Sequence, residues 1–108
     1  MHVEVSARTQ RILQRLQPAA DLASSIEAVT LDALRMRLRN VADRIGAFEA
    51  SYGQPFEQFA ADWDAGRVPD RFSRHVERDF MDWEALTMER QELLLLIREV
   101  AAPGNAAA

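Results

Sequence analysis

The chain has 108 residues, 48% of them hydrophobic, and a formal net charge of −4 at pH 7. This composition is ordinary for a globular chain and argues against wholesale disorder. It contains no cysteine, which excludes disulfide bonds and thiolate metal sites and agrees with a reducing cytoplasm, where we expect the protein. We expect no secretory signal, because the chain does not open with a basic region followed by an apolar stretch. We expect no membrane contact, because the longest apolar run, Leu93 to Ile97, is far too short to cross a bilayer.

The charges are distributed unevenly along the chain. Residues 1–45 carry seven arginines and five acids, whereas residues 46–108 carry six arginines and twelve acids. Such asymmetry indicates two parts with different partners. We therefore predict a unit over 1–45, a second unit over 46–102 and a flexible tail over 103–108. A chain this short buries only a modest core as a monomer, so a homodimer is expected.

The first element is predicted to be a short strand. Residues 2–6 alternate between polar and β-branched side chains, which is typical of a strand. No other segment resembles a strand, so its pairing partner would come from a second molecule. A helix over 7–17 should follow and end at Pro18, and Asp21 or Ser24 can cap a long helix over about 24–51.

The second half is predicted to form an antiparallel helical pair joined by a short bridging helix. Gly53 supplies a left-handed stop for the long helix, and Pro55 suits the start of the bridging helix, which ends at Gly66. Ser73 is a reasonable N-cap for the last helix, which runs to about residue 100. The predicted fold class is mainly α, with the short N-terminal strand as the only β element.

No pattern for catalysis is present, and we predict neither an enzyme nor a cofactor. Glycine-rich phosphate loops and the common metalloprotease and hydrolase motifs are missing. His2 and His75 lack the spacing of metal ligands. The run Asp62 to Gly66 is similar to the opening of a calcium loop, but Ser73 stands where the last acidic ligand belongs. The acids after residue 76 alternate with arginines, which is typical of a solvated helix face.

The order of strand, short helix, polar turn and longer helix is the ribbon-helix-helix arrangement. Two such chains pair their strands, and the ribbon can enter the DNA major groove. The start of the second helix would offer backbone N–H groups to a phosphate. The predicted DNA-binding residues are His2, Glu4, Ser6, Arg8, Ser24 and Ser25. The outward ribbon face contains an acid and no arginine or lysine, so a unit that only dimerises remains the alternative.

Three segments resemble a known family. Leu22–Val29 through Leu34 to Leu38 looks like the second helix of ribbon-helix-helix antitoxins. Phe48–Phe59 and Asp79–Ala85 are similar to motifs of small antitoxin-like proteins of bacterial toxin–antitoxin systems, among them the TumA-type antitoxins encoded beside TumE-type toxins. One departure is Pro55, where a serine-like cap is expected.

The resemblance implies an antitoxin that neutralises a cognate protein toxin and regulates its own operon by binding operator DNA. The acidic, aromatic second unit would then cover the toxin, because acidic helices can screen the basic surface of a toxin that acts on RNA. The predicted toxin-binding residues are Trp63, Phe72, Asp79, Asp82 and Glu89. The alternative is a helical structural or assembly protein with neither a toxin nor a DNA partner.

Overall fold

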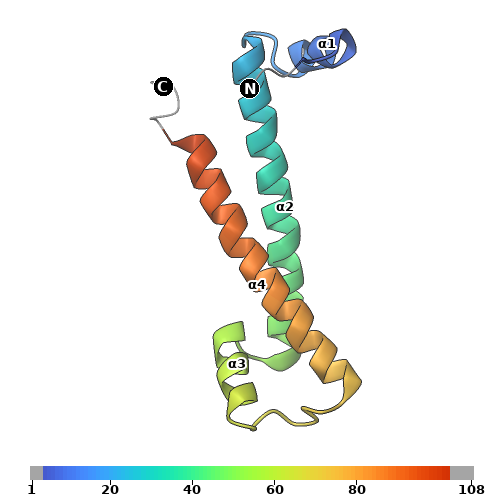
Figure 1. The fold of residues 1–108 in the computed structure, drawn as a ribbon, viewed down its shortest axis with the longest axis vertical. Helices are drawn as coiled ribbons and strands as arrows, with labels where there is room; N and C mark the ends of the chain where they lie inside the picture. Colours follow the sequence, from blue (N-terminus) through green and yellow to red (C-terminus); the bar gives the residue numbers. More distant parts are fainter. Residues whose placement is uncertain (1–3, 103–108) are drawn as a thin grey trace.

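A computed structural model describes residues 4–102, and these form four helices. They are α1 (Ala7–Leu16), α2 (Leu22–Tyr52), α3 (Phe56–Asp64) and α4 (Arg74–Ala101). Figure 1 shows α2 and α4 as a long antiparallel hairpin, with α3 at the end where the two helices are joined and α1 at the opposite end. We call these the closed end and the open end. The molecule measures 55 × 28 × 24 Å, so the hairpin determines its elongated shape.

Local signals account for the helix boundaries. The side chains of Ser6, Asp21 and Ser73 each accept a hydrogen bond from a backbone N–H three residues on, which caps α1, α2 and α4. Gly53 ends α2 in the left-handed conformation with φ 70°, which costs glycine no strain. Pro55 precedes α3 without a side-chain cap. The stops and caps predicted at Gly53 and Ser73 are confirmed.

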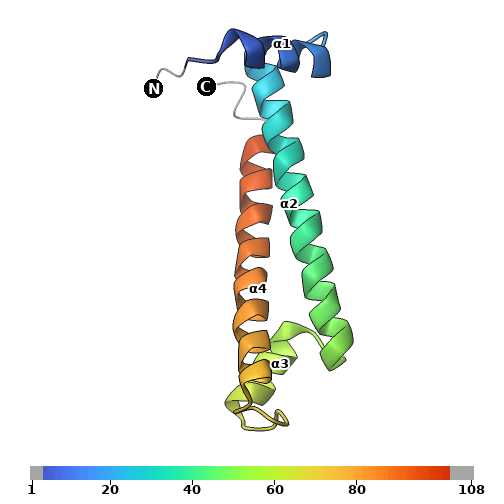
Figure 2. The ribbon, with the colours of Figure 1, turned by 90° about the vertical axis from the view of Figure 1, so that its right-hand side faces the viewer.

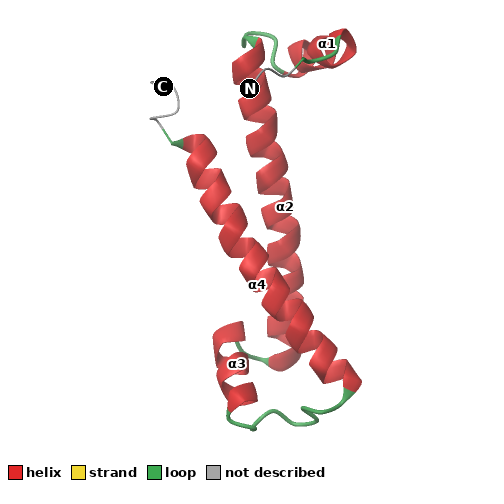
Figure 3. Cartoon of the chain, in the orientation of Figure 1, coloured by secondary structure: helices red, strands yellow, loops and turns green. Residues whose placement is uncertain are grey.

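The predicted N-terminal strand is wrong. Residues 4–6 are neither strand nor helix, and every element of the described part is helical, as Figure 3 shows. Ser6 instead caps α1 through a 3.1 Å hydrogen bond from the Thr9 backbone N–H. A strand needs a neighbour for its backbone hydrogen bonds, and no other described segment provides one. The fold is therefore all-helical and not ribbon-helix-helix, while His2 lies outside the described residues.

The hairpin is held together by one apolar seam on each helix. On α2 the seam uses Leu34, Leu38, Val41, Ile45 and Phe48, and on α4 it runs from Val76 through Trp83 and Leu86 to Leu93. These positions are three or four residues apart, which places them on one face of each helix. The predicted boundary between residues 45 and 46 falls inside α2, next to the buried Ile45, so no linker separates the two parts there.

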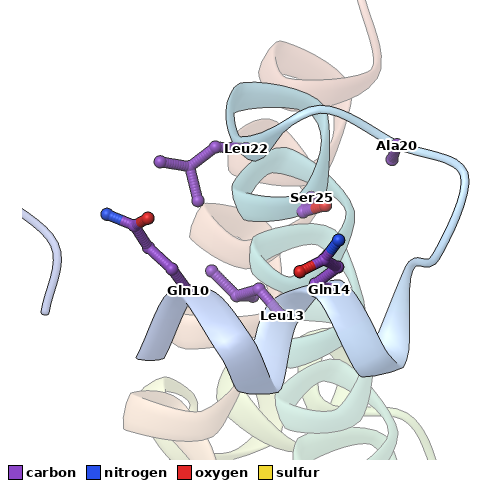
Figure 4. Close-up of a pocket in the computed structure, with 6 residues that line it drawn as sticks. All are labelled: Gln10, Leu13, Gln14, Ala20, Leu22 and Ser25. Atoms are coloured by element: carbon purple, nitrogen blue, oxygen red, sulfur yellow. The ribbon is translucent and has the colours of Figure 1, made fainter. Parts of the chain in front are cut away.

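Helix α1 contacts the start of α2 through a small interface. Leu13 is the only buried residue of α1, and it lies close to Ser25 and Leu22 of α2 in a hollow that Gln10 and Gln14 flank (Figure 4). The small serine at this point lets the two helices approach closely. In Figures 1 and 2, α1 crosses the top of α2 and does not lie along α4. One buried leucine anchors α1, so its opposite face is left in solvent.

Candidate protein-binding surfaces

Most of the aromatic side chains form one cluster at the closed end. Trp83 of α4 is 0% exposed and stacks on Phe48 of α2, with ring centroids 5.5 Å apart. Phe59 of α3 lies 5.0 Å from the same indole, and Phe56 lies 5.4 Å from it. Trp83 thus joins three helices. Because such offset and edge-on aromatic pairs are directional as well as apolar, the cluster gives the closed end a fixed shape.

A side-chain hydrogen bond joins α2 to α4 beside this cluster. The hydroxyl of Tyr52 donates a 2.6 Å hydrogen bond to Oδ2 of Asp79, and Nε2 of His75 lies 3.4 Å from the same oxygen. Burial raises the pKa of Tyr52 to about 12, and the hydrogen bond to Asp79 adds to the effect. Asp79, a predicted toxin-binding residue, is therefore half-buried and bound to Tyr52.

The most exposed aromatic side chain stands beside the cluster. Phe72 is 82% exposed and lies on the loop that leads into α4. The Arg71 guanidinium carbon is 5.2 Å from the centroid of the Phe72 ring and 5.6 Å from that of Trp63. Trp63 in turn stacks on Phe80, with ring centroids 4.5 Å apart. Cation–π contacts of this kind orient a side chain, so Phe72 is connected to the rigid core through Arg71. We call Trp63, Arg71 and Phe72 the Phe72 surface.

The loop around the Phe72 surface also has ordered features. Arg67 donates hydrogen bonds of 3.2 and 2.9 Å to Oδ1 of Asp62, and the bond from Arg67 is the main cause that lowers the pKa of Asp62. Asp70 has a φ of 55°, in the left-handed region that few non-glycine residues adopt. Residues 66–78 contain four arginines and two acids. The acidity of the second half is therefore not located at Phe72.

The acids lie instead along α4, around a second apolar stripe. Met81, Ala85, Met88 and Leu95 follow one another at helical spacing on the side of α4 that faces away from the hairpin core, and all are exposed. The predicted toxin-binding residues Asp82 and Glu89 are exposed beside this stripe. A shallow groove follows it. The residues that line the groove are Ala85, Met88, Glu89, Gln91, Glu92 and Leu95. We call this the α4 outer face.

The free side of α1 is apolar and basic. Ile12 is 52% exposed and Leu16 is 61% exposed, one helical turn apart. Arg8, Arg11 and Arg15 are exposed as well, and their spacing of three and four places them in a row beside the two apolar side chains. Helix α1 contains no acid. We call this the α1 outer face.

The residues predicted to bind DNA do not form one surface. Ser6 caps α1, and Arg8 is exposed on that helix. Ser25 is only 2% exposed and lies in the hollow between α1 and α2. The backbone N–H of Ser24 donates to Oδ1 of Asp21 at 2.7 Å, and this bond lowers the pKa of Asp21. Glu4 is exposed at the edge of the described chain.

Other kinds of site receive no support from the geometry. Across residues 4–102, no cluster of three or more histidine, aspartate or glutamate side chains could hold a metal ion. No helix of the same span is long and apolar enough to cross a membrane. No family model, no curated protein and no solved structure matches this chain. Support for the candidate surfaces therefore comes only from their own residues and contacts.

The sequence analysis named Phe72 and Trp63 as binding residues, which remains a prediction, and it missed two features. It did not single out Arg71, although an arginine directly before an aromatic residue in a loop suggests a cation–π contact. It assigned the free side of α4 to solvated acids, although Met81, Met88 and Leu95 repeat at helical spacing there.

Proposed function

We propose that this protein acts by binding another protein, and that it is the antitoxin of a toxin–antitoxin pair whose toxin contacts the Phe72 surface. The observation that carries the proposal is the 82% exposure of Phe72 beside the Arg71 guanidinium, which lies over both the Phe72 ring and the Trp63 ring. The resemblance of Phe48–Phe59 and Asp79–Ala85 to antitoxin-like proteins supports the choice of a toxin as the partner. Both segments contribute side chains to the aromatic cluster next to the Phe72 surface.

The Phe72 surface has the features of a binding hot spot. Interface hot spots combine large aromatic and arginine side chains that need little reordering on binding. Phe72 offers an apolar ring, and the Arg71 contact reduces the freedom that the ring would lose on binding. Trp63 is half-buried and supports Arg71 from the core side. A toxin with an apolar pocket rimmed by acceptor groups fits this surface, because Arg71 and Arg74 lie on either side of the two-residue segment Phe72-Ser73.

Operator binding is not part of this proposal. The predicted mechanism needed a paired ribbon at the N-terminus, and residues 4–6 do not form a strand. Asp79 is also left out of the toxin contact, because Tyr52 already binds its carboxylate. Asp82 and Glu89 lie on the α4 outer face and not on the Phe72 surface.

A growth assay tests the proposal. The protein encoded by the neighbouring gene is induced alone, where we expect growth arrest, and then together with this chain, where we expect growth to return. Phe72→Ala should weaken binding of the purified toxin by about tenfold or more, measured by calorimetry. Its melting temperature should stay near that of the wild type, because an exposed ring contributes little to folding.

The matched control is Met36→Ala. It also removes a large exposed side chain, but this one lies on α2, far from the Phe72 surface. It should bind and rescue like the wild type. Failure of the wild-type chain to bind the neighbouring product or to restore growth would show that it is not this toxin's antitoxin. If Phe72→Ala binds the toxin as tightly as the wild type does, the chain is still an antitoxin, but the toxin contacts a surface other than the Phe72 surface.

A further inference from the structure

The chain exposes far more surface than a compact monomer of its size. Its accessible surface is 8318 Å² for a mass of 12.2 kDa, whereas a compact monomer of this mass exposes about 6,000 Å². The radius of gyration is 19.7 Å, against about 13 Å for a compact chain of this length. The excess of roughly 2,000 Å² exceeds the ~800 Å² that each partner buries in a standard stable interface. A second copy could therefore cover much of this surface.

Two of the exposed faces match in apolar character and in length. The α1 outer face presents Ile12 and Leu16, and the α4 outer face presents Met88 and Leu95, which are 65% and 61% exposed. Helix α1 has ten residues, which span about 15 Å. The α4 groove runs from Ala85 to Leu95, which is also about 15 Å along a helix. The flexible methionine can adapt to the two branched side chains.

The same faces are complementary in charge. The apolar pair on α1 lies beside Arg8, Arg11 and Arg15, and the helix has no acid. Between residues 81 and 95, α4 carries four acids, Asp82, Glu84, Glu89 and Glu92, against the single base Arg90. Arg90 is half-buried on the hairpin side and does not belong to the outer face. Two α4 outer faces would repel each other, whereas an α1 and an α4 outer face attract.

The two faces cannot meet within one chain, because α1 packs on the start of α2 through Leu13 and crosses away from α4 (Figures 1 and 2). We propose that the protein is a homodimer in which the α1 outer face of each copy docks on the α4 outer face of the other. The exchange is reciprocal, so a two-fold axis relates two identical contacts. The occupant of the α4 groove is thus a second copy of this chain. This proposal does not depend on the toxin.

The proposed contact between copies is tested by reversing the charges of the two faces in separate variants, which are then mixed. The α1 variant carries Arg11→Glu and Arg15→Glu, and the α4 variant carries Glu89→Arg and Glu92→Arg. Each alone places like charges in both contacts of its own dimer, so its dimer dissociation constant should rise at least about tenfold. When the two variants are mixed, both contacts again join opposite charges. The mixture should form a heterodimer with an affinity near that of the wild type, measured by analytical ultracentrifugation.

Two matched variants control for the change in net charge. Arg35→Glu with Arg39→Glu changes two exposed arginines of α2, and Glu57→Arg with Asp64→Arg changes two exposed acids of α3. Both should dimerise like the wild type. Circular dichroism checks that every variant remains helical, which is expected because all substituted side chains are exposed.

Three results would overturn the proposed reciprocal dimer. The homodimer is ruled out if the wild-type chain stays monomeric at high micromolar concentration. A wild-type dimer that neither variant weakens places the interface elsewhere. If the α1 variant still dimerises but loses affinity for random duplex DNA, then the arginine row of α1 binds a nucleic acid and not a second copy of the chain. None of these results bears on Phe72→Ala and toxin binding, so the two proposals can fail separately.

Discussion

The closed and open ends of the hairpin are built from the same two helices but differ in what covers them. At the closed end α3 adds a third layer, and Trp83 and Phe59 become almost completely buried between α2, α3 and α4. At the open end only the single leucine Leu13 fixes α1, and large side chains such as Leu16 and Leu95 stay exposed. Two helices can bury only the faces they turn toward each other. The interior of the closed end is thus a folding core that carries the Phe72 surface on its outside, whereas at the open end the helices leave their outer faces exposed.

The largest expected effect comes from removing the centre of the closed end. Trp83→Ala should reduce the free energy of unfolding by about 3–5 kcal/mol, because it leaves a cavity among Phe48, Tyr52 and Phe59. A chemical denaturation curve measures this loss. Met36→Ala, on the exposed side of α2, is the control and should change the value by less than about 0.5 kcal/mol. A small loss for Trp83→Ala would mean that the aromatic cluster does not dominate folding.

A smaller and local effect is expected at the open end. Leu13→Ala removes the one buried anchor of α1, which should weaken α1 docking by about 2 kcal/mol, or roughly thirtyfold in the opening equilibrium. Trypsin should then cut faster after Arg11 and Arg15, while the main unfolding transition stays close to that of the wild type. An equal drop in global stability would show that α1 folds as one unit with the hairpin.

The smallest effect concerns the polar contact beside the aromatic cluster. Tyr52→Phe removes the hydrogen bond to Asp79 and should cost about 1 kcal/mol near neutral pH. The pKa of Tyr52 is raised from 10.0 to about 12 in the folded chain. Its contribution is therefore fully present below pH 10 and is lost as the pH rises toward 12, because the unfolded chain ionises first.

Denaturation at several pH values between 9 and 12 measures this dependence. The difference between the wild type and Tyr52→Phe should shrink across that window. A difference that stays constant would mean that the Tyr52 hydroxyl is not buried against Asp79 as the structure shows.

The sequence predicted most of the helical framework because the signals are local. A cap such as Ser73 or a left-handed stop such as Gly53 acts on groups within a few residues, so its effect does not depend on the rest of the chain. The seam on α2 follows from helical spacing in the same way. The terminal strand failed because a strand depends on a partner, and alternation over five residues does not supply one.

The exposure of the candidate binding side chains was decided only by the tertiary structure. Helix α4 carries apolar residues on two sides, and spacing alone does not tell which side will face α2 and which will stay in solvent. Ser25 was predicted to face DNA, but α1 covers it. Asp79 was predicted to face a toxin, but the folded hairpin brings Tyr52 to it from 27 positions earlier in the chain. Local sequence sets the helices, whereas the choice between a buried, bonded or free side chain depends on segments far apart in the chain.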